Sequence, residues 1–180
     1  MGGREADPRG SLRAAQAGSI DDLERLYRAH WPAAHRAAYL VVHDAAAAED
    51  IAQEAFLAAV RALDRFDRRR PFGPWLHRIV VNRAIDWTRA RALRREVDAE
   101  RVPEPFAGLI GEPAGPDPVF SSDLMAALAA LNPEHRAVVV LRHLLEYTPG
   151  EIAKLLDLPR GTVNSRLRRA LDQLETELER

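Results

Sequence analysis

The segment from Thr148 to Leu174 constrains the fold of this chain more than any other part, because it has the pattern of two helices joined by a tight turn. Thr148 and Glu151 are spaced as a capping box, which marks the start of a helix. The residues Asp157-Leu158-Pro159 predict a short turn, in which the leucine fills the angle between the helices. A second helix is expected from about Arg160. This pattern predicts a helix-turn-helix.

The second helix of this segment divides into an apolar and a polar face. Val163, Leu167 and Leu171 are spaced by four residues, so we expect them to face inward. Arginine and asparagine on the opposite face can donate paired hydrogen bonds to guanine and adenine in the major groove, which a recognition helix enters through its N-terminal residues. A helical hairpin with a basic, solvated face is the alternative. The residues expected to reach DNA are Thr162, Asn164, Ser165, Arg168 and Arg169.

Helical periodicity also runs through most of the chain before this segment, and no alternating strand pattern appears. Ser19, Asp44 and Asn132 stand where helix caps are favoured, and Pro32 is expected to break or kink the first helix. The first 18 residues are rich in glycine, arginine and proline, so we expect them to be frayed. The expected helices cover residues 20–31, 33–42, 45–63, 75–94, 121–131 and 133–145.

Between residues 95 and 118 the helical pattern fails, because this stretch contains five prolines and three glycines. We interpret it as a flexible linker. The predicted fold class is therefore all-α, with two small helical domains joined by a flexible linker, the C-terminal one a helix-turn-helix. The predicted division is a flexible N-terminus at 1–18, a first domain at 19–95, an acidic linker at 96–120 and a second domain at 121–180.

Charge is strongly segregated along the chain, although the formal net charge is only −1. Residues 61–95 carry eleven arginines and three aspartates, a net charge of +8, and residues 154–169 have a net charge of +4. Residues 96–123, which lie between them, have a net charge of −6. Two basic blocks separated by an acidic one indicate two nucleic-acid contacts joined by a linker that does not touch DNA. Solvated helix faces are the alternative.

The first basic block also contains aromatic residues, among them Phe66. Aromatic rings can stack on unpaired bases while arginine follows the phosphates, which suits single-stranded or melting DNA. The alternative places the rings in the core. Taken alone, Trp75 and Trp87 favour the core, whereas Phe72 fits either role.

The helix expected at 45–63 has an acidic face opposite its apolar one. A charged helix face of this kind is typically solvated. It could instead receive a basic partner helix. The face consists of Glu49, Asp50, Gln53 and Glu54.

Composition excludes several functions and weakens others. The chain has no cysteine, which excludes disulfides, thiolate zinc sites and iron–sulfur clusters. The six histidines show no metal-ligand spacing, and no phosphate loop or nucleophile elbow appears, so we expect no metal, no cofactor and no catalytic site. No apolar run is long enough to span a bilayer, and no signal-peptide core is present. We therefore expect a cytoplasmic protein without membrane insertion.

With these residues in view, the chain resembles the extracytoplasmic-function (ECF) group of bacterial sigma-70 family sigma factors. AAEDIAQEAFLAAVRALDRFD is similar to that family's core-polymerase-binding helix, and RPFGPWLHRIVVNRAIDWTRARALRR is similar to its promoter-melting region. LNPEHRAVVVLRHLLEYTPGEIAKLLDLPRGTVNSRLRRAL is similar to its C-terminal promoter-reading domain. Three motifs in the right order are more specific than any one alone. A stand-alone helix-turn-helix repressor or activator that dimerises through its N-terminal half is the competing hypothesis, and an enzyme acting on nucleic acid has little support.

The resemblance implies a sigma factor that binds core RNA polymerase and directs promoter-specific initiation. It further implies that Asp50, Gln53 and Glu54 contact the polymerase clamp. The residues implied to melt and hold the minus-ten element are Arg70, Phe72, Trp75, Asn82, Arg83, Asp86 and Arg89. Those implied to contact the minus-thirty-five element are Arg160, Thr162, Asn164, Ser165, Arg168 and Arg169. The implied partners are core polymerase, promoter DNA and an anti-sigma factor.

The chain departs from the family pattern in three places. Glu146 stands where glycine is usual before the helix-turn-helix. Asp157 replaces the usual glycine of the turn, although aspartate tolerates left-handed geometry better than most residues. Gly73-Pro74 replaces the common Arg-Thr before Trp75, which bears on the minus-ten contacts and leaves the fold intact.

Overall fold

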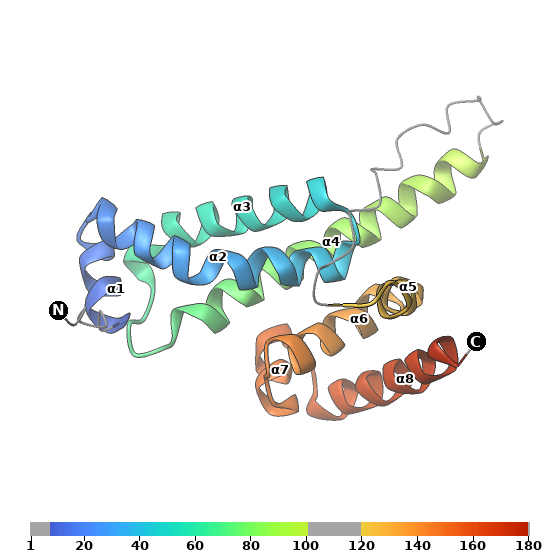
Figure 1. Ribbon diagram of the computed structural model, residues 1–180. Coiled ribbons are helices and arrows are strands. Elements are labelled where there is room, and N and C mark those ends of the chain that lie inside the picture. Colours follow the sequence, from blue (N-terminus) through green and yellow to red (C-terminus); the bar gives the residue numbers. More distant parts are fainter. Residues whose placement is uncertain (1–7, 101–119, 180) are drawn as a thin grey trace.

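The computed structural model describes the backbone of residues 8–100 and 120–179, and every regular element within those ranges is helical. The predicted all-α fold class is confirmed. The helices form two layers, which we call the N-terminal unit (α1–α4) and the C-terminal unit (α5–α8) (Figure 1). The elements of the N-terminal unit are α1 (Pro8–Gln16), α2 (Ile20–Val42), α3 (Ala45–Arg61), a 3₁₀ turn η1 (Leu63–Arg65) and α4 (Phe72–Glu100). Those of the C-terminal unit are α5 (Ser122–Ala130), α6 (Pro133–Val139), a π-helical turn η2 (Val140–Leu144), α7 (Pro149–Leu156) and α8 (Arg160–Leu178).

Side-chain caps set the helix starts that the sequence predicts. The side chains of Ser19 and Asp44 accept hydrogen bonds from the amides of Asp22 and Ala47, at 3.3 and 3.0 Å. Asn132 caps α6 in the same way, and the proline after it occupies the first helical position, where a missing N–H costs nothing. Each cap satisfies a donor that the first turn of a helix leaves unpaired.

Helix α2 runs without interruption from Ile20 to Val42, so of the break or kink predicted at Pro32, the break is wrong. A proline inside a helix removes one backbone hydrogen bond and costs about 3 kcal/mol. Buried side chains on both sides of it, among them Leu26 and Ala34, pack the two halves of the helix into the core. The free energy gained by this packing outweighs the tendency of Pro32 to end the helix.

The predicted frayed N-terminus is wrong for residues 8–16, which form α1, while residues 1–7 lie outside the described residues. Leu12 and Ala15, three residues apart, are buried in the core that α1 shares with α2. Gln16 Nε2 donates hydrogen bonds to the carbonyl oxygens of Leu63 and Phe66, at 2.8 and 3.0 Å. Helix α1 therefore binds the start of the loop that leads into α4.

The predicted linker at 96–120 overlaps α4, which continues to Glu100 instead of ending near residue 94. The assignment of residues 96–100 to a linker is therefore wrong, and residues 101–119 lie outside the described residues. Phe120, at the far end, packs under Arg36 of α2, whose guanidinium carbon lies 4.7 Å from the ring centre. This contact joins the beginning of the C-terminal unit to α2.

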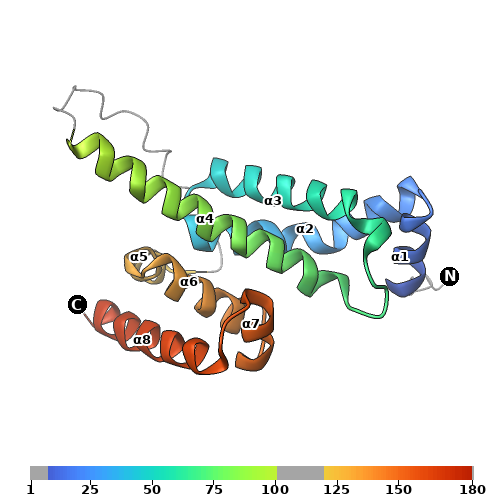
Figure 2. The ribbon, with the colours of Figure 1, turned by 180° about the vertical axis from the view of Figure 1, so that it is seen from behind.

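The two units pack against each other and share one apolar core. Val41 of α2, Val81 of α4 and Leu141 of η2 are fully buried within it. Helices α2 and α4 contact α6, and α4 also contacts α7. Seen from behind, the C-terminal unit lies along one side of α4, with α3 on the other side (Figure 2). The structure is therefore a closed arrangement of the two helical units.

Arg136 is a buried cation where the two units meet, and only 6% of the residue is exposed. Its Nη1 donates a hydrogen bond to the carbonyl oxygen of Val41 at 2.5 Å, and its Nη2 donates to those of Ala129 and Leu131, both at 2.8 Å. These carbonyls lie at the C-terminal ends of α2 and α5, where a helix leaves acceptors unpaired. Burial lowers the pKa of Arg136 to about 10, so the side chain keeps its charge at neutral pH. One guanidinium thus caps two helices.

Candidate nucleic-acid interface

Helices α7 and α8 form the predicted helix-turn-helix. Thr148 Oγ1 accepts a hydrogen bond from the Glu151 amide at 3.3 Å, and the Glu151 carboxylate accepts one from the Thr148 amide at 2.8 Å, which completes the capping box. Asp157 ends α7 with a φ of 55°, the left-handed conformation that glycine adopts most readily. Leu158 packs against the core from the turn, and α8 begins at Arg160 as predicted.

The inner face of α8 differs from the prediction at one position. Val163 and Leu167 are buried, but Leu171 is 44% exposed, so its assignment to the inner face is wrong. Ala170 and Leu174 are buried instead. A constant spacing of four residues drifts around a helix with 3.6 residues per turn, whereas alternating spacings of four and three stay on one side.

The outer face of α8 presents polar side chains to solvent. Asn164, Arg168 and Arg169 are exposed there, and so is Arg160 at the start of the helix. Ser165 is half-buried, and its hydroxyl donates a hydrogen bond to the carbonyl oxygen of Thr162, also half-buried, at 2.9 Å. The structure thus leaves the arginines and the asparagine free to reach a groove, while the two hydroxyl side chains lie lower on the surface.

Arg166 shows how α8 is oriented. It lies two residues from both Asn164 and Arg168, which places it on roughly the opposite side of the helix. Its side chain points inward and forms an ion pair with Glu134 at the start of α6. This pair fixes the inner side of α8 and so directs the polar face outward.

A polar stripe follows one side of α4. Trp75, Asn82, Asp86 and Arg89 recur at helical spacing, so they share one face. Asp86 and Arg89 are exposed, whereas Trp75 and Asn82 are half-buried. Two further predicted residues flank this stripe, Arg70 in the preceding loop, which is exposed, and Arg83, which is half-buried and donates a hydrogen bond to Glu54 of α3 at 2.7 Å.

The aromatic residues before this stripe form a cluster of their own. Phe72 is 7% exposed, and its ring centre lies 5.7 Å from that of Trp75 and 6.1 Å from that of Phe66. The next residue, Gly73, lies close to the ring of His30. A β-carbon at this glycine would be only 3.3 Å from His30 Cε1. The burial of Phe72 leaves its ring no free face for a base, so Phe72 does not fit the predicted contact with the minus-ten element. Trp75 is only half-buried.

The acidic face of α3 is exposed as predicted. Asp50, Gln53 and Glu54 all face solvent, as does Glu49. Helix α3 lies on the side of the N-terminal unit away from α5–α8 (Figures 1 and 2). The closed arrangement of the two units therefore leaves this face open.

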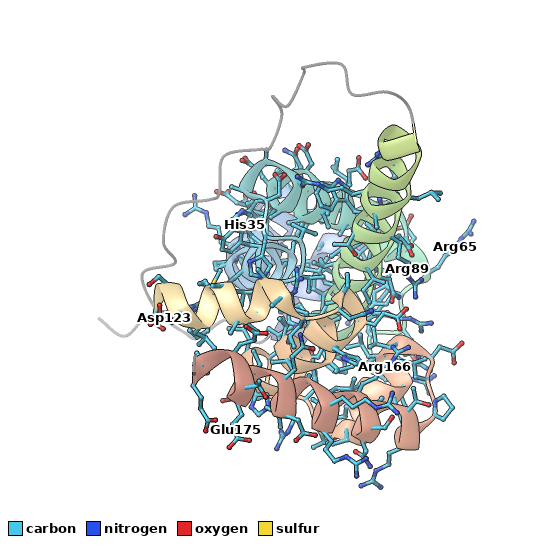
Figure 3. The ribbon with its side chains drawn as sticks, turned by 90° about the vertical axis from the view of Figure 1, so that its right-hand side faces the viewer. His35, Arg65, Arg89, Asp123, Arg166 and Glu175 are labelled. Carbon is cyan, nitrogen blue, oxygen red and sulfur yellow. The ribbon has the colours of Figure 1, made fainter. Side chains whose placement is uncertain are left out.

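Contacts between the two units involve several residues of the predicted minus-ten surface. Arg89 of α4 forms an ion pair with Glu134 of α6, and Arg89 and Arg166 lie at the same edge of the molecule (Figure 3). A cleft of about 530 Å³ separates the loop and start of α4 from α7. Its lining includes Arg70, Trp75, Arg78, Tyr147, Glu151, Lys154 and Leu155. The contacts of Glu134, Arg166 and Tyr147 are not predictable from the sequence, because nothing local to these residues indicates a contact with a distant helix.

His77 is a buried histidine at this contact. Its Nδ1 shares a hydrogen bond of 2.8 Å with the hydroxyl of Tyr147, and its Nε2 has no hydrogen-bond partner among the described residues. Burial, together with the nearby His30, lowers the pKa of His77 to about 4. The side chain is therefore neutral in the folded protein at physiological pH.

Stability is expected to fall as the pH drops from about 6.5 towards 4, because the unfolded chain binds a proton at His77 in this window and the folded chain does not. Urea unfolding at pH 7 and pH 5 measures the effect. The loss of stability on going to pH 5 should be about 2 kcal/mol smaller in His77→Gln than in the unmodified protein. His143→Gln, at an exposed histidine, is the control and should keep the full loss. If stability depends on pH equally in all three proteins, His77 is not the cause of the loss.

Within 8–100 and 120–179, no helix is both long and apolar enough to cross a membrane. In the same ranges, no group of three histidine, aspartate or glutamate side chains is arranged to hold a metal ion.

Comparison with known proteins matches both units to one family. Residues 26–94 match sigma-70 region 2, and residues 121–174 match sigma-70 region 4. The chain is 33% identical over 161 residues to the ECF RNA polymerase sigma factor SigE of Mycolicibacterium smegmatis, a match that covers 87% of this chain and 61% of that protein. It is 34% identical over 146 residues to the ECF RNA polymerase sigma factor SigW of Bacillus subtilis, covering 76% of each.

Two solved structures are similar to the whole arrangement. CnrH, solved in complex with the cytosolic domain of CnrY, matches with a TM-score of 0.69 and 28% identity, covering 96% of this chain and 98% of that one. The sigma factor RpoE from Bartonella quintana, solved with the anti-sigma factor NepR, matches with a TM-score of 0.71, covering 89% and 98%, and its 22% identity shows the fold alone. The matches favour the initiation-factor interpretation over the repressor and the enzyme. With regions 2 and 4 in order and relatives above 30% identity, the chain belongs to the ECF group of sigma-70 family RNA polymerase sigma factors, whose members are transcription initiation factors.

Proposed function

We propose that this chain directs promoter-specific initiation by binding core RNA polymerase through α3 while α4 and α8 contact two promoter elements. The observation that carries the proposal is the separation of three exposed polar surfaces onto these three helices. The α3 surface faces away from the C-terminal unit, so polymerase can occupy it without covering the outer face of α8. One chain can then bind the enzyme and the promoter together.

In this proposal the outer face of α8 reads the minus-thirty-five element. Asn164 and Arg168 lie one helical turn apart and are exposed, so they can reach neighbouring base edges. The remaining residues of this surface support phosphate contacts, which position the helix and carry no sequence information. These are Arg160, Thr162, Ser165 and Arg169.

The polar stripe of α4 holds the melted minus-ten element in the same proposal. Extruding a base from the stack costs a few kcal/mol, which contacts with the protein must offset. The half-buried Trp75 offers an aromatic ring for a base, Asn82 and Asp86 offer hydrogen bonds, and arginine offers charge for the phosphates. The arginines concerned are Arg70, Arg83 and Arg89.

We further propose an anti-sigma factor as a partner of this chain. RpoE of Bartonella quintana was solved with the anti-sigma factor NepR, and CnrH was solved with the cytosolic domain of CnrY. The matched chains of these two structures cover 96% and 89% of this chain. The proposal is tested by isolating the protein from its own cells and asking whether an anti-sigma factor is bound to it.

Reversing the charge of Asp50 tests the polymerase surface. Asp50→Arg should weaken binding to core polymerase at least tenfold, because it places a like charge against the basic helix that the acidic face is proposed to receive. Equilibrium binding to purified core polymerase measures the change, and promoter-specific transcription should fall with it.

Asp172→Arg, at an exposed aspartate of α8, makes the same change of charge elsewhere and should leave the affinity for polymerase within about twofold. Equal affinities of the two variants would show that α3 is not the contact surface. If the unmodified protein forms no complex with core polymerase, the proposed function itself fails.

A further inference from the structure

Glu134, the second residue of α6, is shared between the two helices that are proposed to contact DNA. One carboxylate oxygen, Oε1, accepts a hydrogen bond from Nη2 of Arg89 on α4, and the other, Oε2, is paired with Nη2 of Arg166 on α8. The hydrogen bond from Arg89 and the charge of Arg166 both lower the pKa of Glu134, so the carboxylate is ionised at neutral pH. A single carboxylate thus joins α4, α6 and α8.

The two ion pairs differ in what they connect. Arg166 and Glu134 belong to the same unit, and both side chains are largely buried. Arg89 comes from the other unit, and 60% of its side chain is exposed. Separation of the units would therefore break the pair with Arg89 and leave the pair with Arg166 intact. The carboxylate keeps a partner, so opening leaves no bare buried charge.

Arg89 also belongs to the α4 stripe that is proposed to hold the minus-ten element. A guanidinium recognises carboxylate and phosphate through the same geometry of donors. In the closed arrangement the Glu134 carboxylate therefore occupies Arg89 in the way that a DNA phosphate would.

We propose that Glu134 is a positioning residue that holds Arg89 in the closed arrangement, so that promoter DNA must displace its carboxylate and separate the two units. This inference rests on the proposed function of α4. Neutral contacts at the same boundary, such as the hydrogen bond between His77 and Tyr147, are independent of this ion pair. An ion pair with one exposed partner contributes modestly, so the expected change in the ratio of closed to open protein is about two- to fivefold.

Single-stranded DNA of mixed sequence, bound to the full chain, tests the proposal. Glu134→Gln should bind this DNA about two- to fivefold more tightly than the unmodified protein. Glu24→Gln is the matched control, because it adds the same unit of charge and breaks an ion pair within α2, with Arg28. Its affinity should stay unchanged. In an Arg89→Gln background the gain from Glu134→Gln should disappear.

Energy transfer between two dyes reports the arrangement of the units directly. The chain has no cysteine, so Ile20→Cys and Glu175→Cys give two unique attachment points on exposed positions of α2 and α8. Glu134→Gln should shift the transfer efficiency towards the value seen on DNA binding. In the labelled protein that keeps Glu134, raising the salt from about 50 to about 500 mM should produce a shift in the same direction.

A gain in DNA affinity that persists without Arg89, or a transfer efficiency that responds neither to Glu134→Gln nor to salt, would overturn the inference. These outcomes differ from failure of the proposed function. In that case core polymerase does not bind, while the transfer efficiency still reports the ion pair.

Discussion

Arg136→Met should lower the free energy of unfolding by about 2–4 kcal/mol. The guanidinium is buried and donates three hydrogen bonds to carbonyl oxygens at the ends of α2 and α5. Methionine keeps much of the aliphatic volume but donates none of these bonds. Because water has little access to the site, the carbonyl of Val41 and its neighbours lose their partner without replacement. Urea unfolding followed by circular dichroism measures the change.

Arg142→Met is the control for this substitution. Arg142 lies six residues further on, in η2, and is exposed; its hydrogen bond to the carbonyl oxygen of Tyr147 is long, at 3.4 Å. Its replacement should change stability by no more than about 0.5 kcal/mol. A loss below about 1 kcal/mol in Arg136→Met would mean that the carbonyls find other donors, and that the cation is not what holds α2 to α5.

Arg168→Ala should weaken binding of the polymerase complex to its promoter by about 5- to 150-fold, which corresponds to the roughly 1–3 kcal/mol that one good paired contact with a base contributes. The side chain is exposed on the outer face of α8, while Arg166 anchors the opposite face through Glu134. Promoter fragments recovered with the assembled polymerase provide the DNA. Affinity for core polymerase without DNA should not change.

Whether the loss of affinity depends on the DNA sequence distinguishes a contact with a base from a contact with a phosphate. The loss in Arg168→Ala should be confined to DNA with the intact upstream element and vanish when that element is scrambled. Arg160→Ala, at the start of α8, removes a proposed phosphate contact and should weaken binding to both sequences alike. A uniform loss in Arg168→Ala as well would mean that the residue contacts only the backbone.

Local signals explain which parts of the fold the sequence predicts well. The capping box of Thr148 and Glu151, the turn at Asp157 and the caps Ser19 and Asp44 each depend on residues within four positions of one another. Glu146 stands where the family usually has glycine, and its φ of 58° lies in the left-handed region. A residue other than glycine adopts this backbone conformation at some cost in free energy. The exposed faces of α3 and α8 follow from helical spacing in the same way.

Contacts between distant segments explain what the sequence does not predict. Helix α2 continues through Pro32 because buried side chains pack on both sides of it. Helix α1 forms because Leu12 and Ala15 pack against α2. The roles of Arg136 and Glu134 depend on partners 95 and 45 positions away. Phe72 is ambiguous in sequence, since an aromatic residue in a basic loop suits both core and surface until its neighbours are placed.

The hydrogen bonds of Gln16 have a practical consequence for anyone who trims this protein. The region that matches the family begins only at Leu26, so a shortened form designed on family boundaries would discard α1. The carbonyls of Leu63 and Phe66 would then lose the hydrogen bonds that Gln16 donates, and the start of the loop that leads into α4 would no longer be held. Such a fragment would keep both regions by which the family is recognised, yet it would enter any promoter-melting assay with that loop untethered.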